Sequence, residues 1–298
     1  MVAKVYEPML ELPEEGLPAN RRLQWRLAHF LLFLAAGLVI FSLDSSYIDL
    51  FPTNNSTAFK VIVPAGFLGM ALLCRRSRQA RPYWSLAYAC FVASAAILFA
   101  WLLIDLDDWL LARLGLALRS DAGMAVSKVV EVVLMVVPIL LLSRAAGWDL
   151  GSLYLRRGRL AFGLVAGGLI LMNYAVTALA VAGNTTGQLE RLLPALPWMV
   201  LFAFANGFME ELWFRGLFLG RLAPFLGDNG ALLLTSVVFT VAHAGALYLA
   251  DAMIWLFLLL LFPLAVGFGW LMQQSRAIWG STIFHGAADL FWFIIFGF

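Results

Sequence analysis

The sequence predicts an all-α, polytopic membrane protein built as a bundle of about nine transmembrane helices. Hydrophobic residues make up 63% of the 298-residue chain and charged residues only 13%, whereas soluble globular proteins carry about 25% charged residues. The mean hydropathy is +0.89. Apolar stretches also recur along the whole chain, and roughly 20 apolar residues suffice to cross a bilayer. These observations exclude a soluble enzyme, a DNA-binding module and a disordered protein.

The apolar stretches define the expected helices, because a segment in hydrocarbon must satisfy its own backbone N–H groups and so cannot be an open strand. They lie at about residues 27–43, 58–74, 83–104, 124–142, 160–182, 196–220, 231–249, 253–272 and 279–297. The first stretch follows a polar leader, and no clear small-residue cleavage site comes after the stretch. We therefore interpret the first stretch as a transmembrane helix rather than a cleaved signal peptide.

Basic residues predict the orientation of the bundle. If the nine helices alternate in direction, 14 of the 20 basic residues fall on one side, five on the other, and Arg215 lies inside a helix. The first side carries Lys4, Arg21, Arg22, Arg26, Arg75, Arg76, Arg78, Arg81, Arg144, Arg156, Arg157, Arg159, Arg221 and Arg276. The second carries Lys60, Arg113, Arg119, Lys128 and Arg191, against Asp44, Asp49, Asp105, Asp107 and Asp108. The positive-inside rule then predicts a cytoplasmic N-terminus and a C-terminus on the opposite side.

Small residues offer a few further predictions. Gly163 and Gly167 form a GxxxG face, a pattern typical of closely packed membrane helices. Cys74 and Cys90 lie in or beside apolar stretches without a CxxC or Cys/His pattern, so we expect both to be core residues.

Ionisable side chains inside membrane helices are costly, and they mark functional sites by default. Three late helices each carry a polar stripe. The first contains Asn206, Glu210, Glu211 and Arg215, the second Ser236, Thr240 and His243, and the third His285 and Asp289. We expect the stripes to converge on one water-accessible cavity. Glu131 is explained by a local ion pair with Lys128, and His29 by an interfacial position.

Helical geometry separates the two adjacent glutamates. Glu211 lies four residues before Arg215 on one face, the favourable order for an intrahelical ion pair. Glu210 is turned by about 100° and can point elsewhere, on the face of Asn206. A purely structural role remains open for the Glu211–Arg215 pair. Ser236 and Thr240 are expected to bond back to their own helix backbone.

The order of these residues resembles a known family. Glu210-Glu211-x-x-x-Arg215, Phe239-x-x-x-His243 and His285-x-x-x-Asp289 are similar to the three motifs of the CAAX protease and bacteriocin-processing (CPBP, or Abi) family of intramembrane proteases. That family includes the type II CAAX prenyl endopeptidases. The resemblance covers about residues 194 to 298.

The resemblance implies an all-helical membrane bundle with a site that opens toward the cytoplasm. It implies that Glu210 and His243 activate a water, that His285 and position 289 stabilise the oxyanion, and that Glu211 and Arg215 support the site. Prenyl endopeptidases typically have Asn at position 289. An ionised Asp cannot donate a hydrogen bond, so we expect Asp289 to orient His285 instead.

Peptide hydrolysis needs a base for water, a donor for the oxyanion and an acid for the leaving amine. The residues favour a metal-independent glutamate mechanism with no cofactor. Zinc is the alternative, with His243 and His285 as ligands beside a carboxylate, although the sequence has no HExxH motif. The rival functions are a transporter, in which the same residues would form an ion pathway, and a non-enzymatic immunity-type membrane protein.

The predicted organisation is a cytoplasmic leader at residues 1–26, N-terminal transmembrane helices at 27–182 and a CPBP-like catalytic core at 194–298. The expected partners are membrane lipid and a membrane-associated, prenylated or unmodified, protein or peptide substrate, and no nucleic acid. Arginine outnumbers lysine 17 to 3, as is typical of GC-rich bacterial genomes, so we expect a multi-pass protein of a bacterial cell membrane.

Overall fold

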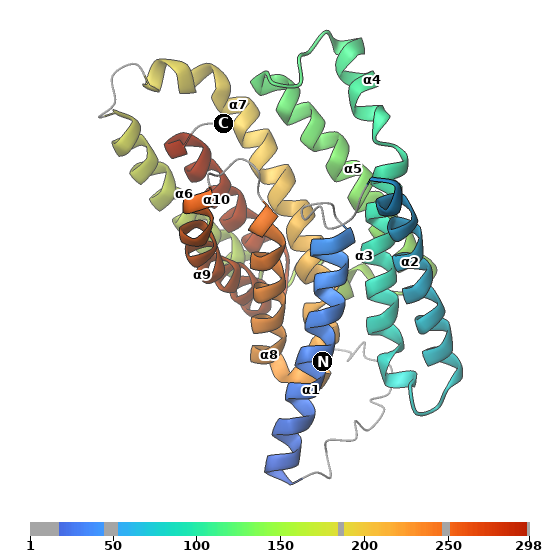
Figure 1. Cartoon of the computed structure of the whole chain (residues 1–298). Coiled ribbons are helices and arrows are strands. Elements are labelled where there is room, and N and C mark those ends of the chain that lie inside the picture. Colours follow the sequence, from blue (N-terminus) through green and yellow to red (C-terminus); the bar gives the residue numbers. More distant parts are fainter. Residues whose placement is uncertain (1–17, 45–52, 184–187, 246–250, 297–298) are drawn as a thin grey trace.

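The computed structural model describes residues 18–44, 53–183, 188–245 and 251–296, and within these ranges every element is helical. Long helices lie side by side in a bundle, as Figure 1 shows. In chain order the elements are α1 (Ala19–Leu38), η2 (Val39–Asp44), α2 (Thr53–Arg76), η3 (Arg81–Tyr83), α3 (Trp84–Leu102), α4 (Asp105–Leu114), α5 (Asp121–Ala145), η4 (Leu150–Leu153), α6 (Leu160–Gly183), α7 (Gln188–Glu210), η5 (Glu211–Gly216), α8 (Leu219–Ala242), η6 (His243–Gly245), α9 (Asp251–Ser275) and α10 (Trp279–Phe296).

The all-α membrane bundle predicted from the sequence is confirmed. The apolar stretches overlap the long helices, although the stretch at 196–220 runs through α7 and η5 into the start of α8, and the stretch at 231–249 extends past the end of α8 at Ala242. Eight helices of the described residues are long and apolar enough to cross a membrane. The ninth, α10, has 18 residues and is not among the eight. His285 and Asp289 lower its hydropathy, so the residues that suggest a function also weaken its membrane signal.

One helix was not expected from the sequence. α4 occupies a segment that composition assigned to a loop, because it is short and rich in aspartate. Asp105, Asp107 and Asp108 lie in its first turn and Arg113 in its last, which favours the helix dipole at both ends. Gly115 then ends the helix in the left-handed conformation, with φ 66°.

The basic residues of several connections meet at one end of the bundle. The backbone N–H of Arg159 donates to the carbonyl of Ser275 over 2.6 Å, and Arg156 Nε donates to the carbonyl of Arg276 over 2.8 Å. The α5–α6 connection is therefore tied to the α9–α10 turn, as alternating helices require. Lys4, Asp49 and Phe298 lie outside the described residues, and the side of the membrane that this end faces stays a prediction.

The glycine face on α6 does pack closely, against the start of α10. A Cβ on Gly167 would approach the carbonyl oxygen of Gly280 to 2.9 Å, and one on Gly163 would come within 3.2 Å of Ser275 Cβ. The helix pair α6–α10 thus meets through small residues, as the GxxxG pattern predicted. This contact fixes the N-terminal end of α10, which carries two of the candidate site residues.

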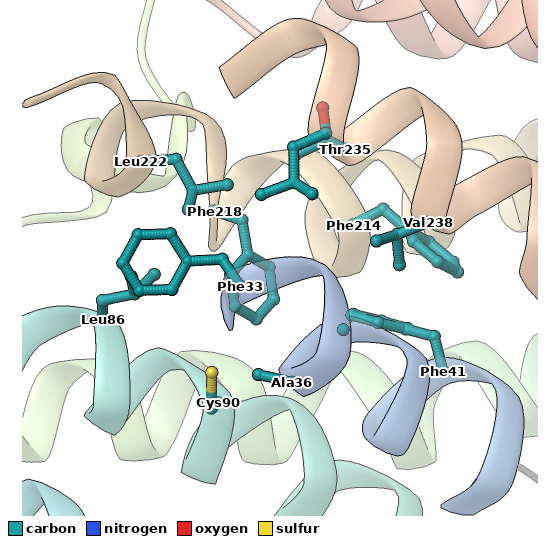
Figure 2. A pocket seen from close by; sticks show the side chains of 12 residues that line it. Phe33, Ala36, Phe41, Leu86, Cys90, Phe214, Phe218, Leu222, Thr235 and Val238 are labelled. Atoms are coloured by element: carbon teal, nitrogen blue, oxygen red, sulfur yellow. The ribbon is translucent and has the colours of Figure 1, made fainter. Parts of the chain in front are cut away.

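A small apolar cavity lies between α1, α3, η5 and α8, and Figure 2 shows its lining. Phe33, Phe41, Cys90 and Phe214 are among the side chains around it. Cys90 and Cys74 are both buried free thiols, as expected for core residues. The lining holds no acidic, basic or histidine side chain, so the cavity is distinct from the polar cluster described next, although Phe214 directly precedes Arg215.

Candidate active site

The polar cluster begins where α7 changes its winding. α7 ends at Glu210, and the chain continues without a break as the π-helix η5, in which Leu217 N–H bonds to the carbonyl of Leu212, five residues earlier. Single π turns inside helices are rare and occur often at functional sites. The change of winding falls between Glu210 and Glu211, so the two adjacent carboxylates leave the helix toward different neighbours. No simple pattern in the sequence predicted this π turn.

A close crossing of α7 and α10 places the histidine of α10 beside both glutamates. A Cβ on Gly207 would lie 3.1 Å from the backbone nitrogen of Gly286, 3.2 Å from His285 Cβ and 3.3 Å from the carbonyl oxygen of Thr282. These contacts are tighter than almost all real Cβ contacts. Glycine at position 207 therefore sets how closely the two helices approach.

Glu211 is the centre of a fully buried hydrogen-bond network. Its Oε1 accepts from Arg215 Nη1 over 2.6 Å and contacts His285 Nδ1 over 2.9 Å, and its Oε2 accepts from the Ser281 hydroxyl. Glu211 and Arg215 both have 0% exposed surface. The predicted intrahelical ion pair is confirmed. Its arginine also donates to the carbonyl of Ala265, so the pair holds three helices together.

This network defines the orientation of His285. An ionised carboxylate only accepts hydrogen bonds, so the proton on Nδ1 belongs to the bond with Glu211, and Nε2 is left to face the rest of the site. Phe268 stacks on the imidazole with ring centroids 4.5 Å apart and planes at 8°, and Phe239 meets it edge-on at 5.6 Å. The ring is thus fixed by one hydrogen bond and two aromatic contacts.

His243 is fixed in a comparable way directly after α8. The α-helix ends at Ala242, earlier than the apolar stretch indicated, and His243 begins the short turn η6. Its Nδ1 lies 2.8 Å from the carbonyl oxygen of Phe239, a favourable bond for histidine at a helix C-terminus. Because a carbonyl only accepts, Nδ1 carries the proton and the lone pair of Nε2 points away from the helix.

Glu210 lies between the two histidines. Its Oε2 is 3.7 Å from His243 Nε2 and 3.5 Å from His285 Nε2, beyond ordinary hydrogen-bond length. The same buried oxygen accepts no hydrogen bond from the described protein groups. An unsatisfied buried carboxylate oxygen is costly, so this atom is the chemically least satisfied acceptor of the cluster. That is the property expected of a group that acts on a small polar molecule.

Asp289 borders the cluster at its more accessible edge. Its Oδ1 lies 3.8 Å from His285 Nε2, within ion-pair range but too long for a hydrogen bond. Its Oδ2 accepts a hydrogen bond from Asn206 Nδ2 over 3.1 Å. The side chains of Asp289 and His243 are each 22% exposed, whereas that of His285 is 4% exposed.

Most of the polar stripes meet as the sequence predicted, but part of one does not. Glu210, Glu211, Arg215, His243, His285 and Asp289 form one connected cluster. Thr240 instead donates to the carbonyl of Ser236 on its own helix, as expected. The Ser236 hydroxyl is buried without a hydrogen bond in the described structure, so the predicted bond back to its helix is absent.

Sequence reasoning missed Ser281 and Phe268 and gave Asn206 no role. Ser281 could have been found, because it lies four residues before His285 and therefore shares its helix face. Phe268 carries no such signal, since one phenylalanine among many apolar residues of α9 looks like any other.

The zinc alternative needs three or more protein ligands gathered around one point. Within the described part of the chain, no group of three or more His, Cys, Asp or Glu side chains is arranged to hold a metal ion. The Nδ1 atoms of His285 and His243 bond to Glu211 and to a backbone carbonyl, which leaves the Nε2 atom of each ring facing the site. We therefore derive no step of the reaction through a metal.

Comparison with known proteins locates a family domain over this same region. Residues 192–291 match the family model described as type II CAAX prenyl endopeptidase Rce1-like. Comparisons with curated proteins and with solved structures returned no match. The matched segment contains α7 from Leu192 onward, η5, α8, α9 and α10 as far as Phe291, and so every residue of the polar cluster. Residues 192–291, with every residue of the polar cluster, are therefore similar to the Rce1-like type II CAAX prenyl endopeptidases, a family of intramembrane proteases.

Proposed function

We propose that this protein is a metal-independent intramembrane endopeptidase that hydrolyses peptide bonds of membrane-associated substrates with a water activated by Glu210 and His243. One observation carries the proposal. The unsatisfied buried oxygen of Glu210 faces the Nε2 atoms of two histidines from two other helices. Both Glu210 Oε2 and the neutral His243 Nε2 accept hydrogen bonds, so a single water can donate one proton to each.

In the first step the water oxygen attacks the carbonyl carbon of the scissile peptide bond. Glu210 takes one proton from the water as the new C–O bond forms, and the carbonyl oxygen becomes an oxyanion. His285, in its protonated form, donates a hydrogen bond from Nε2–H to this oxyanion, while its Nδ1–H remains hydrogen-bonded to Glu211. Hydrogen bonds aimed at a developing oxyanion are usually worth more than any other single catalytic contribution.

In the second step the tetrahedral intermediate collapses. Glu210 returns its proton to the peptide nitrogen, the C–N bond breaks, and the products are a free amine and a carboxylic acid. The second hydrogen of the water ends on the new acid and is released on ionisation. The enzyme thereby regains its starting protonation state, and one water is consumed for each bond broken.

The buried network around Glu211 supports this chemistry without taking part in it. The carboxylate accepts from Arg215, from Ser281 and from His285, which leaves it little capacity to act on water. The substrate would reach the site from the edge where His243 and Asp289 are exposed. A peptide held at the membrane surface by its own lipid group, including a prenylated one, fits a site embedded among membrane helices.

The test is a cleavage assay with purified protein in lipid vesicles. Fluorogenic peptides ending in a CAAX sequence would be offered with and without a prenyl group. We expect cleavage by the parent protein, and a loss of about 10²-fold or more in His243→Asn, typical of removing an acid–base partner.

His29→Asn is the matched control. His29 bonds to the carbonyl of Trp25 and to Tyr83 Oη at the basic end of the bundle, away from the polar cluster. It should keep the parental rate per folded molecule. Equal rates for His243→Asn and the parent, or no cleavage of either peptide class by the parent, would contradict the proposed function.

A further inference from the structure

We propose that Asn206 is a positioning residue, whose amide holds the Asp289 carboxylate and so sets the distance between Glu210 and His285. The inference rests on the proposed function, because it concerns the same site. Asn206 Nδ2 donates to Asp289 Oδ2 over 3.1 Å, between residues 83 positions apart in the sequence. This hydrogen bond links α7 to the C-terminal half of α10.

The two helices present matching pairs of side chains. On α7, Asn206 and Glu210 lie four residues apart and share a face, and on α10, His285 and Asp289 do the same. α7 and α10 run in opposite directions in Figure 1, so Asn206 faces Asp289 while Glu210 faces His285. The glycine contact between Gly207 and Gly286 lies between these two pairs. The Asn206–Asp289 bond therefore fixes the register in which the catalytic pair meets.

The charges around Asp289 explain why a donor is needed there. Asp289 feels the charges of Glu210 at the end of α7, His243 in the turn η6 after α8 and His285 on its own helix. Its Oδ1 is only 3.8 Å from His285 Nε2. Glu210 Oε2 lies 3.5 Å from the same nitrogen. Two carboxylates directed at one nitrogen repel each other, and a neutral amide relieves this without adding charge. With Oδ2 held by Asn206, Asp289 turns Oδ1 toward the imidazole.

The decisive experiment reverses the hydrogen bond. Asn206→Asp replaces the amide by a carboxylate of the same shape, so that two carboxylates face each other and no donor remains. We expect kcat to fall about 10²-fold at pH 7.5, the size of loss that follows a displacement of about 1 Å in a catalytic site, with a smaller change in KM. The double variant Asn206→Asp/Asp289→Asn restores one donor and one acceptor. It should recover to within about tenfold of the parent.

The pH profile provides a readout that a role in packing alone would not move. Acidification protonates one of the two facing carboxylates in Asn206→Asp, and a protonated acid donates a hydrogen bond to its neighbour. The rate of this variant relative to the parent should rise as the pH is lowered from 8 to 5.5, whereas the double variant should show no such relative rise. Asn173→Asp is the control for a carboxylate added to a membrane helix, since Asn173 is an exposed residue of α6, and it should keep the parental profile.

A thermal unfolding cycle in detergent keeps this inference separate from the proposed reaction. The melting temperatures of Asn206→Asp, Asp289→Asn and the double variant should be non-additive, with the double variant more stable than Asn206→Asp. That coupling is expected even if the parent cleaves no peptide. Additive stabilities, or a double variant that is no more active than Asn206→Asp, would overturn the positioning role.

Discussion

Two acid–base pairs within single helices of the described residues differ in their burial and in their further partners. Lys128 and Glu131 lie three residues apart on α5, with side chains 15% and 40% exposed. Glu211 and Arg215 lie four residues apart, and both are fully buried. The first pair has Phe202 near its lysine. The second also binds Ser281, His285 and a carbonyl of α9.

The difference shows what distinguishes a site from a local ion pair. An acid and a base three or four residues apart on one helix can form an ion pair in either half of the chain. Their spacing in the sequence therefore does not show which pair belongs to a functional site. Around the second pair, polar groups of α7, η5 and α10 also meet one another, over separations of 74 and 83 residues. Convergence of separate helices on unsatisfied charge is therefore the useful criterion, and each of the following predictions tests it.

The largest effect should come from neutralising the acid of each pair. Glu211→Gln leaves Arg215 buried without a counter-charge, which costs about 3–5 kcal/mol for a buried pair. Glu131→Gln removes a partly exposed pair and should cost about 1 kcal/mol or less. Thermal unfolding in detergent, with expression level as a second readout, measures both. Equal stability of the two variants would remove the distinction between the pairs.

A smaller effect should follow from a substitution that pushes α7 and α10 apart where they cross at Gly207. Gly207→Ala requires the facing atoms of α10 to give way by a few tenths of an ångström, so we expect a loss of about tenfold in cleavage rate, less than the ~10²-fold that follows a misplacement of about 1 Å. Gly168→Ala is the matched control, because a Cβ on Gly168 of α6 meets nothing within 4 Å. Its rate should equal that of the parent, and an equal loss in both variants would mean that the crossing is not specific.

Position 289 sharpens the comparison within the site itself. An asparagine there can still accept from the Asn206 amide, so Asp289→Asn should retain activity within about tenfold of the parent. Asp289→Leu can accept no hydrogen bond and should lose about 10²-fold or more. Steady-state cleavage rates of the two variants decide the matter. If both lose the same amount, the negative charge rather than the hydrogen bond is what the site requires.

The smallest expected effect is that of chelation. The glutamate mechanism needs no metal, so exhaustive dialysis against a chelator should change the cleavage rate by less than about twofold. The control is a known zinc protease treated in the same buffer. If activity disappears and returns with added zinc, His243 and His285 act as ligands, and the proposed mechanism is wrong.

The arginines that lie at one end of the bundle also predict which side of the membrane that end faces. A single cysteine introduced at Ser77, between α2 and η3, should react with a membrane-impermeant reagent only after the cytoplasmic side is opened. The native Cys74 and Cys90 are buried and serve as the unlabelled background. Labelling of intact cells would reverse the predicted topology.

The sequence was sufficient to predict the fold class, the helices of the described residues except α4, and the residues that meet at the site. Hydropathy predicts membrane helices well because the bilayer leaves few alternatives. The helical period likewise predicts which residues share a face, as for Glu211 with Arg215 and His285 with Asp289. These are local properties, and a single sequence records them directly.

What the sequence could not predict depends on contacts between helices. The π turn that begins at Glu211 has no signal in the sequence, and the hydrogen-bond partner of Asp289 proved to be Asn206 rather than His285. Asn206 shared the face of Glu210 in the sequence, but its use depends on the register of α7 against α10. The helix α4 was not predicted because the sequence signals its two ends, with aspartates in its first turn and a glycine after its last, but has no long apolar stretch.

The central claim is that the adjacent glutamates divide the work, with Glu210 acting on water and Glu211 holding the site together. The most direct test measures the cleavage rate and the melting temperature of Glu210→Gln on the same preparation. Glutamine keeps the shape of the side chain but removes the base, so we expect a loss of about 10²–10⁴-fold in rate with a melting temperature within a few degrees of the parent. A Glu210→Gln protein that cleaves at the parental rate, or that is inactive only because it unfolds, would contradict the account.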